Sequence, residues 1–332
     1  MAWWRRLLPG RKGYTTLDLF KEIYGGRAAH TGKSVTVQTA LDVVTVLGCV
    51  RVLAEGVAQI PLKLFQETDR ARMPAKDHPL YPVLFRRPND WQTSFEYRET
   101  LMFHLALCGN HFSYVNRIRG QVVELIPFEP RQVKVTRAPN YDLSYEITSP
   151  DGGSKQAFPA AAIWHVRGPS WNSWMGMEAV TLARDAIGLA MSIEEQQASF
   201  YKNGAHVSGM FSIDGTLTDE QHKQLNKWIE QYQTGGDKAG GTLLLDRAAK
   251  FTQRVMSAVD AQTLESRRHQ IEEICRAFRV MPIMVGFSDK TATYASAEQM
   301  FLAHVVHTLS PWYERIEQSI DVSLLSDADQ RA

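Results

Sequence analysis

Apolar side chains recur every three or four residues in five stretches of the chain, which is the spacing of helices that pack on one face. The first stretch, residues 39–59, ends before Pro61. The second, residues 93–108, has Thr93 and Glu96 at the spacing of a capping box, and Gly109 follows it as a helix stop. The other three predicted helices are 177–202, 260–279 and a last one with the expected buried stripe Leu302, Val305, Leu309, Trp312, Ile316 and Ile320.

Between residues 111 and 168 the pattern changes to short β-branched or aromatic runs separated by Gly, Pro, Asn or Asp. Such runs predict an antiparallel β region, and Gly120 predicts a hairpin turn between the first two strands. A further run, 60–65, also predicts a strand. The strands expected in the β region are 111–118, 121–128, 131–138, 143–148 and 161–168.

The two long helices at 177–202 and 260–279 enclose a compact insert, residues 204–258. This insert combines strand-like runs, one helical stretch with Trp228 and Tyr232, and the glycine-rich sequence TGGDKAGG. The pattern predicts a stalk of two helices with a small mixed tip, within an α+β fold.

The composition, with 44% hydrophobic and 22% charged residues among 332, is typical of a globular protein. The formal net charge of +1 excludes a polycation that coats nucleic acid by charge alone. Residues 1–33 differ, because they are basic and include Trp3 and Trp4; they form either a contact for nucleic acid or a membrane surface, or a flexible solvated arm. No apolar stretch reaches the roughly 18 residues of a membrane span and the N-terminus lacks a signal-peptide core, so we expect a soluble protein made inside the cell.

Motifs for catalysis or metal binding are absent from the sequence. The segment RAAHTGKS, residues 27–34, resembles a phosphate-binding P-loop, but Arg27 stands where the first glycine is required. His304 and His307 lie on one helix face without a suitably spaced third ligand. The three cysteines form no CxxC pair, and neither a GxSxG elbow nor an HExxH motif occurs. We therefore expect no enzymatic activity, no metal and no cofactor.

A small, polar loop at 286–296 precedes the last helix. It carries one base, one acid and four hydroxyl groups, and a loop of this kind is either mobile or functional. In the helix that follows, Pro311 removes a backbone hydrogen bond and predicts a kink.

Eight segments in a fixed order resemble the portal proteins of tailed bacteriophages, most of all the short-chain portals of long-tailed phages. The resemblance extends over about residues 40–322, and its segments are RRPND, FEYRETLMFHLALCGNHFSYVNR, VELIPFEPRQVKV, IWHVRG, MGMEAV, FYKNGAHVSGMF, FRVMPIMVG and TYASAEQ. The resemblance implies a non-enzymatic ring, usually of twelve subunits, that replaces one pentamer at a capsid vertex. DNA is packaged and ejected through the axial channel of such a ring.

The resemblance also implies a division of the chain. The expected parts are a flexible basic arm (1–38), a wing (39–175), two stem helices (176–203 and 259–281), an α/β clip (204–258), a tunnel loop with a kinked wing helix (282–322) and a short C-terminal tail (323–332). Two departures stand out. Arg279 replaces the glycine of an FGVPP-like sequence, and the chain ends soon after the kinked helix, so the crown is expected to be short or absent.

Two sets of site residues follow from this division. The tunnel loop is expected to line the DNA channel with Ser288, Asp289, Lys290, Thr291, Thr293 and Tyr294. The clip is expected to present Trp228, Tyr232 and Lys238 to docking proteins, although Trp228 equally suits the core of a small domain.

The resemblance also implies which partners the protein has. They are double-stranded DNA, bound without sequence specificity, further copies of the chain, the large terminase subunit, a head–tail adaptor, and the major capsid and scaffold proteins; no membrane is involved. The expected location is the portal vertex of the virion, after synthesis in the bacterial cytoplasm.

Two other classes of function remain as alternatives. A DNA-associated enzyme or motor subunit is disfavoured by the missing P-loop glycine and the lack of an acidic metal cluster. A monomeric binding module with a basic arm is distinguished from a ring by its mass in solution.

Overall fold

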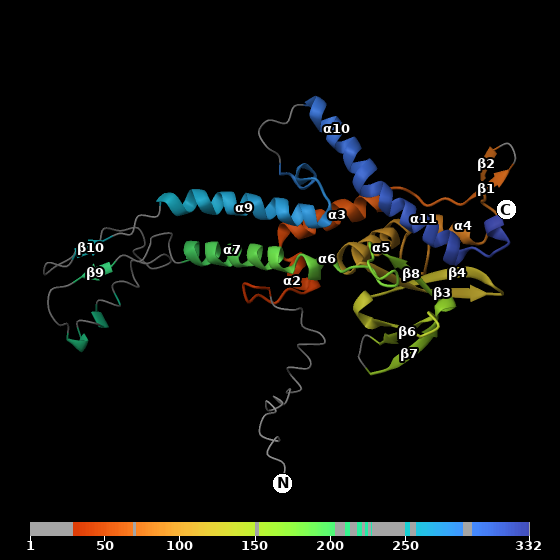
Figure 1. The fold of residues 1–332 in the computed structure, drawn as a ribbon, viewed down its shortest axis with the longest axis horizontal. Coiled ribbons are helices and arrows are strands. Elements are labelled where there is room, and N and C mark those ends of the chain that lie inside the picture. The colour runs from red at the N-terminus through yellow and green to blue at the C-terminus, as the bar shows by residue number, and fades with distance from the viewer. Residues whose placement is uncertain are drawn as a thin grey trace, which may run out of the picture.

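The computed structural model describes residues 29–68, 71–149, 153–202, 257–287 and 294–331, together with the short pieces 210–212, 218–220, 223–224, 227 and 250–252. Figure 1 shows two long helices, α7 (Arg184–Lys202) and α9 (Ser257–Phe278), lying side by side on one side of a mixed body of helices and sheets. The predicted α+β class and the predicted pair of long helices are confirmed.

Helix α3 (Val44–Ala58) runs through the main core, where it packs against α5 (Ser94–Cys108) and α9. Its Val50, Leu53 and Val57 are buried, as their helical spacing predicts. The single helix predicted at 39–59 is divided into α2 (Val37–Leu41) and α3, since Val43 is extended and starts the second helix.

Residues 29–38, which were expected to be part of a flexible arm, are packed against α7. Ala29 and Val35 are buried, and the Ala29 methyl group lies against Gly188, where an added Cβ would come within 2.3 Å of it. The backbone N–H of His30 donates to Asp185 at 3.0 Å. The packed part of the chain therefore extends further toward the N-terminus than the hydrophobic pattern indicated.

Helix α5 begins and ends as its sequence predicts. Thr93 accepts a hydrogen bond from the Glu96 N–H, and the Glu96 carboxylate accepts one from the Thr93 N–H at 2.7 Å, which completes the capping box. Gly109 follows in the left-handed conformation, with φ at 69°. Helix α4 (Leu80–Phe85) precedes α5 and supplies Leu80, Val83 and Leu84 to the core.

The β region is antiparallel throughout the described residues, as predicted. One sheet has the order β4-β3-β8, from β3 (Asn110–Ile118), β4 (Gln121–Phe128) and β8 (Ile163–Arg167). The other has the order β5-β6-β7, from β5 (Val133–Arg137), β6 (Leu143–Thr148) and β7 (Lys155–Pro159). Arg119 and Gly120 both have positive φ in the β3–β4 hairpin, which confirms the predicted turn.

Two strands were missed and one was misplaced by the hydrophobic pattern. A strand was predicted at 60–65, but the observed strand β1 is Phe65–Thr68, so the two share only Phe65. Strand β1 pairs with β2 (Ala71–Pro74), which was not predicted. Strand β7 was also not predicted. Both missed strands are largely exposed edge strands, so they carry little of the apolar alternation that identifies a half-buried strand.

The first of the two long helices is interrupted near its start. Helix α6 (Ala179–Leu182) is separated from α7 at Ala183, so the predicted helix 177–202 is also divided.

Strands β9 (Met210–Ser212) and β10 (Lys250–Thr252) pair antiparallel within the insert.

The end of α9 explains how arginine replaces glycine at residue 279. The Val280 N–H donates to the Cys275 carbonyl at 2.9 Å and the Arg279 N–H to the Arg276 carbonyl at 3.1 Å, the two hydrogen bonds of a Schellman motif. Arg279 adopts the left-handed conformation with φ at 55°. The turn that glycine favours is thus kept by a residue with a Cβ. It leads into the short helix η4 (Pro282–Val285).

The last helix is interrupted by a π-helical turn. Helix α10 (Tyr294–His304) continues through π-helical Val305–Leu309 into α11 (Ser310–Leu324), and the short helix η6 (Asp329–Arg331) follows. Pro311 lies in the first turn of α11, just after the π-helical turn. The bend at Pro311 stays a prediction, whereas the change in hydrogen-bonding pattern beside it is observed.

The expected buried stripe of this last helix is only half right. Leu309, Ile316 and Ile320 are buried, but Leu302 and Val305 are exposed. Residues 298–302 are all exposed, on every side of the helix, because α10 extends away from the body of the molecule (Figure 1).

Candidate functional site

Most of the residues assigned to sites from sequence lie outside the described residues. These are Trp228, Tyr232 and Lys238 of the expected clip, and Ser288, Asp289, Lys290, Thr291 and Thr293 of the expected tunnel loop. Tyr294 is the first residue of α10. The chain on both sides of 288–293 is described, and the site is built from it.

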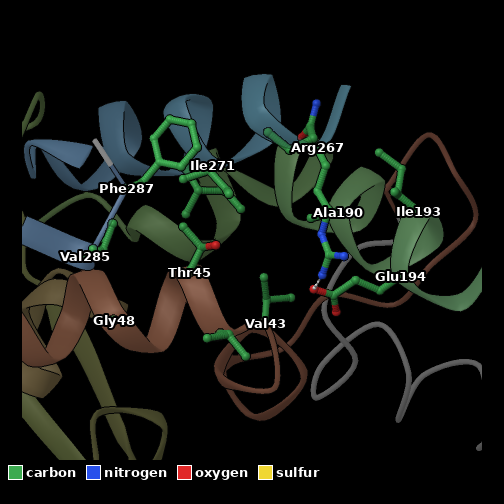
Figure 2. Close-up of a pocket in the computed structure, with 14 residues that line it drawn as sticks. Val43, Thr45, Gly48, Ala190, Ile193, Glu194, Arg267, Ile271, Val285 and Phe287 are labelled. Carbon is green, nitrogen blue, oxygen red and sulfur yellow. Dashed lines mark ion pairs between the residues drawn. The ribbon is translucent and has the colours of Figure 1, made fainter. Parts of the chain in front are cut away.

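A groove lies where α3, α7, α9 and η4 meet, directly before residues 288–293. Figure 2 shows side chains from these elements converging on it, with Phe287 and Val285 at one end and Glu194 at the other. Its volume is about 470 Å³. The lining is mainly apolar, with Val43, Val44, Ala190, Ile193, Ile271, Ile274, Val285 and Phe287, while Thr45, Gly48, Gly286, Glu194, Arg267 and Gln270 complete it.

Charge is confined to the rim of this groove. Arg267 pairs with Glu194 at 3.7 Å and donates to the Gln197 side chain at 2.9 Å, and both Arg267 and Glu194 are well exposed. Gln270 is different, because its side chain is only 8% exposed and its Oε1 has no hydrogen-bond partner among the described residues. An unpaired buried acceptor is costly. The groove therefore offers an apolar surface and one unsatisfied acceptor.

Two thiols lie in the core beside the groove. The Sγ atoms of Cys49 on α3 and Cys275 on α9 are 3.8 Å apart, and both residues are free and buried. The hydrogen bond between them, together with burial, raises the pKa of Cys49 far above its ordinary value. Cys49 is thus held as a thiol, which is a packing group and not a nucleophile.

A second polar cluster is buried between α5, β3 and β8. The His104 and His111 Nδ1 atoms are 3.1 Å apart, His111 Nε2 is 2.9 Å from the Ser113 hydroxyl, and that hydroxyl is 2.6 Å from the Tyr97 hydroxyl. Beside it, His165 Nε2 is 3.1 Å from Asn110 Oδ1, and its Nδ1 is 3.2 Å from the Tyr145 hydroxyl.

All three histidines of this cluster are held neutral. Burial lowers the pKa of His104 to about 4 and that of His165 to about 3, and burial also lowers the pKa of His111. Because Asn110 Oδ1 only accepts, His165 donates from Nε2 and accepts the Tyr145 hydroxyl at Nδ1. His111 and Ser113 are fully buried, so their contact is inaccessible to a substrate and serves the structure.

In the part of the chain that the structure describes, no group of three or more His, Cys, Asp or Glu side chains is arranged to hold a metal ion. Across the same residues, no helix combines the length and the apolar character that crossing a membrane requires.

The groove was not foreseen in the sequence. Its lining residues come from four separate elements, and each of them fits an ordinary core pattern in its own segment. The sequence feature that could have indicated the groove is the position of Phe287 and Val285 beside the polar loop, at the base of the two long helices.

Known proteins are similar to this chain over most of its length. The model of the family described as phage portal protein matches residues 44–332. The portal protein of Enterobacteria phage HK97 is 26% identical, over 99% of this chain and 78% of its own length. The probable portal protein of Streptomyces phage phiC31 is 27% identical, over 92% of this chain and 69% of its own length.

Solved structures share the fold. The crystal structure of an HK97-family phage portal protein from Corynebacterium diphtheriae matches with a TM-score of 0.64 at 15% identity, over 88% of this chain and 92% of its own. A chain in the neck of a native gene transfer agent particle matches with a TM-score of 0.63 at 24% identity, over 86% of this chain and 78% of its own. Since the family model covers far more than half of the sequence, the chain belongs to the phage portal protein family, a family of structural and not enzymatic proteins.

Proposed function

We propose that this chain is one subunit of a ring that occupies one vertex of a phage capsid, and that DNA passes through the channel of the ring during packaging and ejection. The family match over residues 44–332 carries the proposal. The similar chain of the gene transfer agent belongs to a neck computed with C12 symmetry, which supports a ring of twelve. The location is then the portal vertex of the virion.

Each part of the ring subunit corresponds to a set of helices and strands of the fold. The helices and sheets up to residue 175 form the wing, α7 and α9 form the stem, and 204–258 form the clip at its tip. Residues 282–322 form the tunnel loop and the wing helix. The observation that supports this division is the side-by-side pair of long helices leading away from the mixed body (Figure 1).

The measurement that tests this function is the mass of the purified chain in solution. Light scattering after size exclusion should give about twelve times the 37.5 kDa of one chain, or the mass of a neighbouring ring size. Electron microscopy of the same sample should show rings with a central hole. A stable monomer under these conditions would contradict the proposal.

A channel through which DNA slides needs weak contacts that do not depend on base sequence. A single good bidentate contact to a base edge is worth about 1–3 kcal/mol and would hold the DNA at particular sequences. Hydroxyl groups and one lysine per subunit instead contact phosphates without reading sequence. We place Ser288, Asp289, Lys290, Thr291, Thr293 and Tyr294 at the channel wall for this reason.

The charge-reversing substitution Lys290→Glu tests the channel lining. We expect filled heads carrying it to retain their DNA several-fold less well, because the balanced charges of Asp289 and Lys290 become two negative charges per subunit facing the phosphates. Lys76→Glu, at an exposed position on the described surface, is the matched control. Packaging and retention equal to those of the control would remove Lys290 from the proposed channel.

The clip is the proposed docking surface for the large terminase subunit and afterwards for the head–tail adaptor. Trp228, Tyr232 and Lys238 are the residues assigned to it, because aromatic side chains dominate binding energies at protein interfaces. Deleting residues 215–240 should abolish capture of terminase in a pull-down, and undiminished capture would show that the docking surface lies elsewhere.

A further inference from the structure

Helix α10 presents an apolar face to solvent. Phe301 and Val305 form one pair four residues apart and Leu302 and Val306 another, so all four side chains share one side of the helix. All are exposed, Leu302 by 64%. Figure 1 shows α10 extending away from the body of the molecule. Leu302 and Val305 belong to the stripe that was expected to be buried, and the single chain leaves both exposed.

The groove between α3, α7, α9 and η4 is the complementary surface. Its walls are apolar, and Val44 at its edge is 75% exposed.

The charges of the two surfaces are also complementary. The rim of the groove on α9 carries Arg267, with Arg268 beside it, and both are exposed. Glu298 is exposed on α10 and lies three and four residues before Phe301 and Leu302, on the same face. Because Arg267 is already paired with Glu194, the cation left for Glu298 of a neighbouring copy is Arg268, which has no ion pair among the described residues.

Helix α10 cannot turn back into the groove of its own chain, because the chain that follows it is fixed in the core. Leu309 packs against Gly56 of α3, and the Thr308 hydroxyl donates to the Arg279 carbonyl at 2.9 Å. Ile316 and Ile320 of α11 are buried in the same core. The apolar face of α10 and the groove are thus both exposed in the single chain.

We propose that the apolar face of α10 in one subunit packs into the groove between α3, α7, α9 and η4 of a second copy of this chain. The contact joins two different surfaces of the same protein, so each copy uses its helix toward one neighbour and its groove toward the other. Head-to-tail contacts of this kind form a ring when the rotation between successive copies closes after a whole number of subunits. The inference rests on the proposed ring and assigns the surfaces that hold its subunits together.

Three substitutions at exposed positions test the contact by light scattering. Val44→Glu alters the groove, Phe301→Asp alters the helix, and Val322→Glu is the control, at a residue that is 77% exposed on α11. We expect the first two variants to lose the ring mass and run as single chains, while the control keeps the mass of the unaltered protein. Circular dichroism verifies that all three remain folded.

Mixing the two altered proteins distinguishes this contact from a symmetric one. The helix of the Val44→Glu chain is intact and so is the groove of the Phe301→Asp chain, so an equimolar mixture should form pairs of twice 37.5 kDa and no larger species. A contact between two α10 helices does not use the groove, so Val44→Glu would then keep the mass of the unaltered protein.

A disulfide between two introduced cysteines tests the same contact in a protein that still assembles. A chain with both Val44→Cys and Phe301→Cys should form a ladder of disulfide-linked chains on oxidation with copper phenanthroline, while either single substitution should give none. Rings that persist in both charged variants, together with no ladder, would overturn the proposed contact while leaving the ring itself intact. An unaltered protein that is monomeric would instead contradict the proposed function.

Discussion

Replacing Gly109 with alanine should destabilise the chain by more than about 4 kcal/mol, an effect large enough to prevent folding of many domains. A Cβ added at Gly109 would lie 2.1 Å from the Met177 carbonyl oxygen and 2.6 Å from its carbon. Both are backbone atoms, so no side-chain rotation relieves the overlap. The positive φ of 69° adds strain of its own.

Gly120→Ala is the matched control for this substitution. Gly120 also has a positive φ, of 85°, but nothing lies within 4 Å of an added Cβ. We expect it to cost about 1–2 kcal/mol, which is the strain of the left-handed conformation alone. Urea unfolding of both variants at one protein concentration separates the two effects, and equal losses of stability would show that the close approach at Gly109 is not structurally important.

The consequence of Gly109→Ala extends to the two long helices. The Gly109 carbonyl accepts a hydrogen bond from the Gly168 N–H at 2.8 Å, and the Asn110 side chain accepts one from the Gly176 N–H at 2.8 Å. These contacts fix the segment that leads into α6 and α7. Pushing it away would separate the β region from the helices that we propose as the stem.

The second large effect is a loss of stability on mild acidification. Above pH 6.5 the three buried histidines are neutral in both the folded and the unfolded chain. Below that pH the unfolded chain binds protons, while burial keeps the pKa of His104 near 4 and that of His165 near 3 in the folded chain. Stability therefore falls as the pH falls, by about 1.4 kcal/mol per pH unit and histidine.

For His104, His111 and His165 together we expect a loss of about 6 kcal/mol between pH 7 and pH 5. His165→Gln should remove about a third of this dependence, because the glutamine amide keeps a donor for Asn110 but does not titrate. His269→Gln, at an exposed position outside the cluster, is the matched control. Urea titrations at pH 7, 6 and 5 measure it; equal free energies of unfolding at all three would contradict the neutral, buried state of the cluster.

Local signals in the sequence were sufficient for several elements. The capping box of Thr93 and Glu96, the stop at Gly109 and the hairpin at Gly120 involve residues within a few positions of one another, and all three are observed. Antiparallel pairing followed from short strands joined by turns. Strands β2 and β7 were not predicted, because exposed edge strands need little apolar alternation.

Sequence by itself determined the family, the helix spacing and the order of the elements, since these depend on residue types along the chain. Only the tertiary structure decided which apolar residues are buried. Leu302 is exposed although its spacing matches that of the buried Leu309, because α10 extends away from the body of the molecule (Figure 1). Likewise, the groove, its unsatisfied Gln270 and the packing of residues 29–38 on α7 arise from segments distant in the chain, whose meeting no local pattern encodes.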